Sequence, residues 1–223
     1  MISTRNLSLL PDVDRLKALM QSMAMLDAIL QPEWQYRYYS FNSKWSAGEQ
    51  MGSMRNGQGD EFFALFNTAG CWFKGFAHEA PMSPYRDDGS QQVWPGILDT
   101  IPVEFAKCLT QPAFNRTDTT LCIWRRYGDA SWQRGPIVFP KGHHDPDGSA
   151  YLLSPLDGRP ETYTKWAAQY FSNPSPDVEL VRRIYEHRRL TKKLIEQLNP
   201  AITLKDLTAD IKEIGYPSKV RRA

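Results

Sequence analysis

The run Phe62-Phe63-Ala64-Leu65-Phe66 is apolar at every position, so an extended chain there would be apolar on both of its faces. Such a run predicts a central strand that is covered on both sides, by a helix on at least one of them. The segments 56–59 (Asn-Gly-Gln-Gly) and 67–70 (Asn-Thr-Ala-Gly) flank it, and both are typical of hairpin connections. The chain is therefore expected to build an antiparallel sheet around this strand.

The rest of the chain separates into helical and strand-rich parts. Apolar residues recur at helical spacing before the central strand and near the C-terminus, and β-prone segments lie between. The expected helices cover 12–30, 101–109, 160–171, a segment from Ser175-Pro176 onward, 191–198 and 203–214. The expected strands cover 34–41, 47–54, 60–66, 71–78, 119–127 and a shorter, interrupted segment within 131–139.

This order predicts an α+β fold with an N-terminal helix, a central antiparallel meander of about five to six strands and a helical C-terminal region. We expect a single domain over residues 1–223, in which 160–223 form a helical extension packed on the rest. No flexible linker sequence precedes that extension.

Composition favours a soluble globular protein, since 41% of the residues are hydrophobic and 23% are charged. The three cysteines are widely spaced and odd in number, which disfavours a disulfide framework or a zinc knuckle. No apolar run approaches the length that crosses a bilayer, and the N-terminus has no pattern of a secretory signal. We therefore expect a cytoplasmic location, no membrane association and no cofactor.

Two loops and one strand end carry the candidate binding residues. The loop 79–95 contains three prolines and the turn sequence Asp87-Asp88-Gly89, and the loop 140–149 contains two adjacent histidines with two aspartates. Tryptophan and arginine gather near the predicted strand that ends at Tyr127, and these two types dominate binding hot spots. The candidate binding residues are Trp94, Trp124, Arg126, Asp129, Trp132, His143 and Asp145. Asp129 is also a candidate structural partner for Arg126.

The leading functional hypothesis is a binding protein without catalytic activity, which presents this aromatic and charged surface to a protein partner. Small cytoplasmic α+β proteins of this layout include bacterial immunity proteins and other protein-binding modules, a resemblance of architecture only. It implies an immunity-like or regulatory role.

The alternative is a hydrolase with a histidine and aspartate site around residues 143–147, with or without a divalent ion. His143 and Asp145 occupy alternate positions, so an extended backbone would place both on one side, where they could share a metal. His144 and His78 are further candidates. Against this, Asp145-Pro146-Asp147-Gly148 also fits an ordinary type I turn, which needs these residues for backbone geometry alone.

A third hypothesis is nucleic-acid binding through the basic segment from Arg182 to Lys193. Its cations are Arg182, Arg183, Arg188, Arg189, Lys192 and Lys193. Acidic residues interrupt them, and the net charge of the chain is only +2, so we disfavour this hypothesis.

Overall fold

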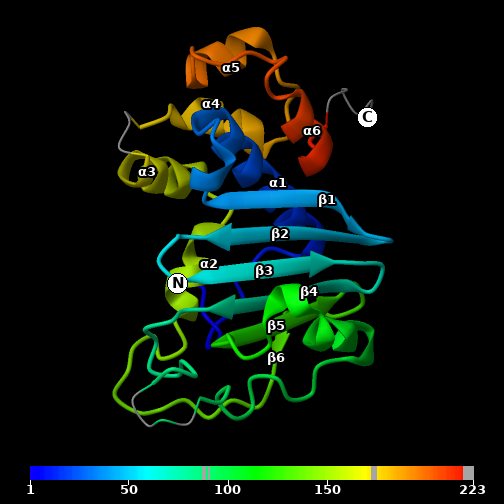
Figure 1. Cartoon of the computed structure of the whole chain (residues 1–223), viewed down its shortest axis with the longest axis vertical. Helices are drawn as coiled ribbons and strands as arrows, with labels where there is room; N and C mark the ends of the chain where they lie inside the picture. The colour runs from blue at the N-terminus through cyan, green and yellow to red at the C-terminus, as the bar shows by residue number, and fades with distance from the viewer. Residues whose placement is uncertain (87–88, 90, 172–174, 218–223) are drawn as a thin grey trace. The chain divides into compact units, whose positions relative to one another are not determined.

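The computed structural model describes residues 1–86, 89, 91–171 and 175–217 (Figure 1). The chain begins with the helix α1 (Val13–Leu30). The strands are β1 (Tyr39–Ser46), β2 (Glu49–Arg55), β3 (Glu61–Phe66), β4 (Gly70–Phe76), β5 (Leu121–Arg126) and β6 (Gln133–Arg134). The later α-helices are α2 (Ser149–Leu153), α3 (Pro160–Tyr170), α4 (Val178–Tyr185), α5 (Lys192–Leu198) and α6 (Thr208–Ile214). The 3-10 helices are η1 (Trp34–Tyr36), η2 (Val103–Thr110), η3 (Pro112–Phe114) and η4 (Ser154–Leu156).

The strands form one six-stranded antiparallel sheet in the order β1-β2-β3-β4-β5-β6. The predicted α+β class, with an N-terminal helix, an antiparallel meander and C-terminal helices, is confirmed. None of the described helices is both long and apolar enough to cross a membrane.

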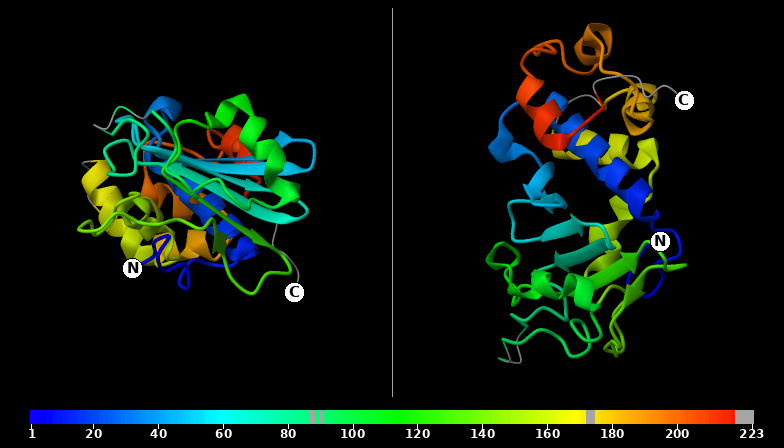
Figure 2. Two further views of the ribbon diagram at one scale, coloured as in Figure 1. Left: turned by 90° about the horizontal axis from the view of Figure 1, so that it is seen from below. Right: turned by 90° about the vertical axis from the view of Figure 1, so that its right-hand side faces the viewer.

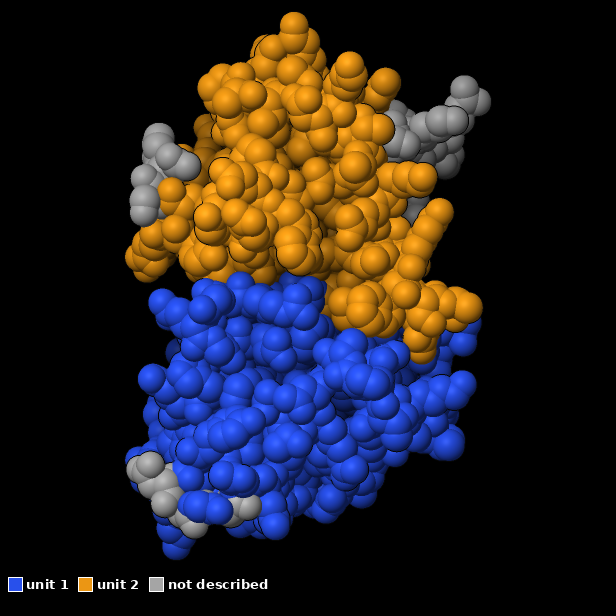
Figure 3. Space-filling view, in the orientation of Figure 1, with its two compact units in different colours: residues 1–13, 53–157 blue, residues 14–52, 158–223 orange. Residues whose placement is uncertain are grey.

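The chain divides into two compact units, coloured separately in Figure 3. Unit 1 contains residues 1–13 and 53–157, and unit 2 contains residues 14–52 and 158–223. The expectation of a single domain with a C-terminal extension stays a prediction. Both units combine segments that are distant in the sequence.

The core of unit 1 lies on both faces of β3 and β4. Their register pairs Phe63 with Lys74, which places these two side chains on the same face. On that face the Phe114 ring of η3 packs 5.4 Å from the Phe63 ring. On the opposite face a side chain at Gly75 would collide with Leu121 and with Leu152 of α2, so glycine permits the helix to approach. The double-sided apolar run thus forms a central, covered strand, as predicted.

The helix α1 is central to unit 2. Its second half is buried nearly all round, as expected for a helix with apolar residues on every side. The Ser22 hydroxyl donates a hydrogen bond to the carbonyl of Ile184 in α4 (3.0 Å). Asn199, which follows α5, donates to the carbonyl of Ile29 (2.8 Å). Figure 2 shows α1 (blue) running between the C-terminal helices.

Several element boundaries differ from the prediction, among them the strand expected within 131–139, of which only Gln133–Arg134 is strand. Two of the differences have a clear local cause. The aromatic segment Trp34–Tyr36 is a 3-10 turn, closed by a hydrogen bond from the amide of Tyr36 to the carbonyl of Glu33, and β1 begins only at Tyr39. The last helix begins at Thr208 and not at 203. There the Asp206 carboxylate accepts hydrogen bonds from both the amide and the hydroxyl of Thr203, which stabilises a turn instead of a helix.

Candidate functional site

The loop 140–149 leads into α2, and Asp145 caps that helix. Its two carboxylate oxygens accept hydrogen bonds from the amides of Ala150 (2.9 Å) and Tyr151 (3.0 Å). These amides belong to the first turn of the helix, where they have no partner within the helix itself. The carboxylate of this predicted site residue is therefore engaged by backbone.

A buried polar cluster joins the same loop to the N-terminal segment. Asp147 is 1% exposed, and it accepts hydrogen bonds from the hydroxyls of Thr4 and Ser149 and from the amide of Ser149. The amide of Thr4 in turn donates to the Ser149 hydroxyl (3.0 Å). Burial raises the pKa of Asp147 above its ordinary value, although these hydrogen bonds oppose the shift.

The histidine side chains of this loop are exposed. One guanidinium nitrogen of Arg5 instead binds their backbone, donating to the carbonyls of His143 (3.2 Å) and His144 (3.0 Å). His78 is held by Asp60, with 3.0 Å between Nδ1 and the carboxylate. Within the described residues, no group of three His, Cys, Asp or Glu side chains is arranged to hold a metal ion. The hydrolase hypothesis thus gains no support from the placement of these residues.

Two of the predicted tryptophans lie in the core of unit 1. Trp124 and Trp132 are each 5% exposed. The indole nitrogen of Trp132 donates to the carbonyl of Pro11 (2.7 Å), so its polar group is satisfied by backbone. Trp124 lies opposite Trp72 in the register of β4 and β5. Both candidate residues therefore have a packing role.

Arg126 and Asp129 form an exposed ion pair that closes the turn after β5. Nη2 of Arg126 lies 3.0 Å from the carboxylate, which also accepts the amide of Arg126 (2.9 Å). The Arg126 guanidinium holds the pKa of Asp129 below its ordinary value. The pairing predicted from the sequence is present.

The buried cysteines are poor nucleophiles. Cys71 and Cys122 are inaccessible to solvent. Burial raises the pKa of Cys122 to about 12 and shifts the pKa of Cys71 in the same direction. Both thiols therefore stay protonated near neutral pH, whereas the thiolate is the reactive form.

Trp94 and Phe139 each pack against arginine side chains, and a hydrogen bond from Trp94 to the backbone of Val138 joins the two contacts. The guanidinium of Arg86 lies 5.2 Å from the centre of the Trp94 ring. The guanidinium groups of Arg5 and Arg134 lie 4.8 Å and 5.2 Å from the centre of the Phe139 ring. We call this set the docking surface; it comprises Arg5, Arg86, Trp94, Arg134, Val138 and Phe139.

Two glycines bring the halves of the docking surface together. A side chain at Gly135 would lie 1.8 Å from the carbonyl oxygen of Gly96, so only glycine allows these two segments to meet. Beside this contact the indole nitrogen of Trp94 donates to the carbonyl of Val138 (3.0 Å). The Val138 side chain itself is 80% exposed, which makes it an apolar point on a basic surface.

Of the residues predicted for binding, Trp94 lies in the docking surface, and the backbone of His143 contacts its Arg5. The sequence pattern does not identify Arg5, Arg86, Arg134 or Phe139. A partial signal exists, because the segment Arg134-Gly135-Pro136 interrupts a predicted strand. Arg5 comes from the other end of unit 1 and has no local signal.

Comparisons of the chain with models of protein families, with curated proteins and with solved structures found no match.

Proposed function

We propose that the chain is a non-catalytic protein-binding module, and that its docking surface takes an acidic segment of a partner protein. The observation that carries the proposal is the pair of half-buried aromatic rings held against three arginine side chains, next to an exposed valine. An immunity-like or regulatory role in the cytoplasm belongs to the same proposal.

The chemistry of the surface supports an acidic partner. The geometry of a guanidinium matches that of a carboxylate. Stacking on the rings and hydrogen bonds from Nη1 of each arginine to backbone carbonyls restrict these side chains before the partner arrives. Arg86 is further fixed by hydrogen bonds to the carbonyls of Ser83 and Gln92, both at 2.9 Å. Less conformational entropy is then lost on binding. Val138, which is 80% exposed, supplies the apolar contact that a partner side chain needs.

Selection from a display library of short random peptides tests this even though the partner is unidentified. We expect enrichment of peptides that combine aspartate or glutamate with an aliphatic or aromatic residue. The affinity of a selected peptide is then measured by titration calorimetry. Trp94→Ala and Arg134→Ala are expected to weaken it by about tenfold or more, as at other hot spots.

Matched controls are Trp34→Ala, which removes a tryptophan that is 62% exposed in unit 2, and Arg126→Ala, which removes an exposed arginine outside the docking surface. Both should leave the affinity unchanged. Failure to enrich any acidic sequence, or equal losses in the controls and in the docking-surface variants, would refute the proposal. Thermal unfolding of each variant establishes that it is folded.

A further inference from the structure

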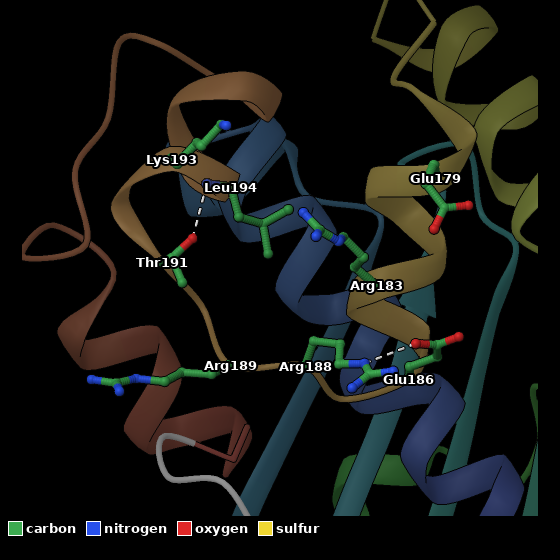
Figure 4. A pocket seen from close by; sticks show the side chains of 8 residues that line it. All are labelled: Glu179, Arg183, Glu186, Arg188, Arg189, Thr191, Lys193 and Leu194. Carbon is green, nitrogen blue, oxygen red and sulfur yellow. Dashed lines mark hydrogen bonds and ion pairs between the residues drawn. The ribbon is translucent and has the colours of Figure 1, made fainter.

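Unit 2 contains an open pocket between α4 and α5, with a volume of about 740 Å³. This volume is within the usual range for small-molecule sites, but most of the residues that line the pocket are charged. The charged residues that line it are Glu179, Arg183, Glu186, Arg188, Arg189 and Lys193. Figure 4 shows these side chains around the turn that connects the two helices.

Neighbouring cations already neutralise the two carboxylates of the pocket. Glu186 pairs with Arg188 at 2.9 Å, and Glu179 pairs with Arg182 at 3.3 Å.

The other three cations of the lining are Arg183, Arg189 and Lys193. Across the part of the chain that the structure describes, none of the three has a carboxylate partner. The pocket therefore carries an excess of positive charge that its own acids do not compensate.

Hydrogen bonds to other segments of unit 2 hold the turn that carries Arg188 and Arg189 in place. The Tyr216 hydroxyl donates to the carbonyl of Arg188 (2.9 Å), and Nε2 of His187 lies 2.9 Å from the carbonyl of Ala18. His187 itself has a φ of +54°, which a non-glycine residue adopts only when its surroundings enforce it. The positions from which these cations project are thus fixed before a ligand binds.

The cations do not converge on one point. In Figure 4 the Arg183 side chain lies in the gap beside Leu194, whereas Arg189 extends in another direction from the turn. A single compact anion would therefore reach only part of the charge. A ligand with several linked anionic groups would reach more of it.

We propose that this pocket binds a chain of linked phosphates. Guanidinium groups match phosphate oxygens with paired hydrogen bonds, and linked phosphates supply closely spaced charges to separated cations. Among the residues that the structure describes, those that line the pocket include no aromatic ring on which a nucleobase could stack. This favours inorganic oligophosphate over single-stranded nucleic acid as the source of the phosphates. The inference is independent of the proposed docking surface in unit 1.

Tripolyphosphate is the probe, and two pairs of adjacent residues give matched variants. Arg183 and Lys193 line the pocket, while Arg182 pairs with Glu161 and Lys192 pairs with Glu196. Each substitution to alanine removes one positive charge from the same short segment.

We expect saturable binding of tripolyphosphate by calorimetry at low and at physiological salt. Arg183→Ala and Lys193→Ala should each weaken it by about tenfold, since hydrogen bonds to charged groups contribute on this scale. Lys192→Ala should change the affinity little, and Arg182→Ala should weaken it clearly less than Arg183→Ala does, because its only expected effect on the pocket is to release Glu179 from its cation. Absence of saturation, or equal weakening by both members of each pair, would overturn the assignment.

Two competing ligands distinguish which class of molecule supplies the anionic groups. Displacement of tripolyphosphate by a short single-stranded DNA, with the same pattern among the variants, would support a phosphate-chain site and identify nucleic acid as its source. Tighter binding of oligoglutamate than of tripolyphosphate would overturn the proposal in favour of an acidic peptide.

Discussion

The buried carboxyl of Asp27 should make the stability of this protein depend strongly on pH. Asp27 in α1 is fully buried, and one of its oxygens accepts the amides of Tyr38 (2.9 Å) and Tyr39 (2.8 Å). The other oxygen accepts the Tyr163 hydroxyl at 2.7 Å. Burial nevertheless dominates these hydrogen bonds and raises the pKa of Asp27 from 3.8 to about 7.

The sign follows from proton binding. Between about pH 4 and pH 7 the folded state holds a proton on Asp27 that the unfolded state has released, so folding stability falls as the pH rises. One unit of pKa corresponds to about 1.4 kcal/mol. Asp27 therefore lowers the free energy of unfolding by roughly 4 kcal/mol at pH 7 relative to its value below pH 4. About 2 kcal/mol of this loss falls between pH 5 and pH 7.

The substitution Asp27→Asn removes the titrating group but keeps its shape. The amide oxygen can accept the two backbone amides, and the amide nitrogen can donate to the Tyr163 oxygen. Urea unfolding at pH 5 and pH 7 should show the loss of stability in the wild type and a much smaller loss in the variant. The exposed carboxyl of Asp99 gives the control Asp99→Asn, which should behave as the wild type. An equal loss of stability between pH 5 and pH 7 in the wild type and in Asp27→Asn would refute the reasoning.

Three further substitutions test the packing of the unit that carries the docking surface. Asp145→Ala removes the acceptor of two α2 amides and should lower the free energy of unfolding by about 1 kcal/mol, whereas His144→Ala should not; equal effects would contradict the capping role. Lys74→Met replaces a 1%-exposed amine that has no hydrogen-bond partner among the described residues and lies 3.8 Å from Glu61, which keeps Arg55 as a second cation; it should raise the free energy of unfolding in urea by about 1 to 3 kcal/mol, and a decrease would show that the amine is stabilising. Gly135→Ala places a methyl group against the carbonyl of Gly96 and should cost about 1 to 3 kcal/mol as measured by thermal unfolding; an unchanged midpoint would contradict the close approach.

The fold class could be predicted because the apolar residues of β3 and its neighbours already indicate in the sequence that these strands are buried. A strand that is apolar on both faces has to be covered on both faces. The hairpin sequences on either side of it connect neighbouring strands directly, and this predicts an antiparallel sheet. The prediction of a strand over Trp34–Tyr36 is wrong, because aromatic residues favour strands without excluding a 3-10 turn.

The candidate site is harder to predict, because a tryptophan has both an apolar body and a polar nitrogen. The sequence does not distinguish Trp132, whose nitrogen binds the carbonyl of Pro11, from Trp94, which lies half-buried in the docking surface. Arg5 reaches Phe139 from a distant part of the chain, and no local pattern marks such a contact. The buried charges Asp27 and Lys74 escape prediction for the same reason, since their surroundings come from tertiary structure.

Hydrogen exchange of the protein with and without a selected acidic peptide tests the docking surface most directly. We predict that the peptide slows exchange of the amides around Trp94 and Val138, and leaves exchange around Arg126 and in α4 and α5 unchanged. Protection confined to other segments, with none at Trp94 or Val138, would contradict the assignment.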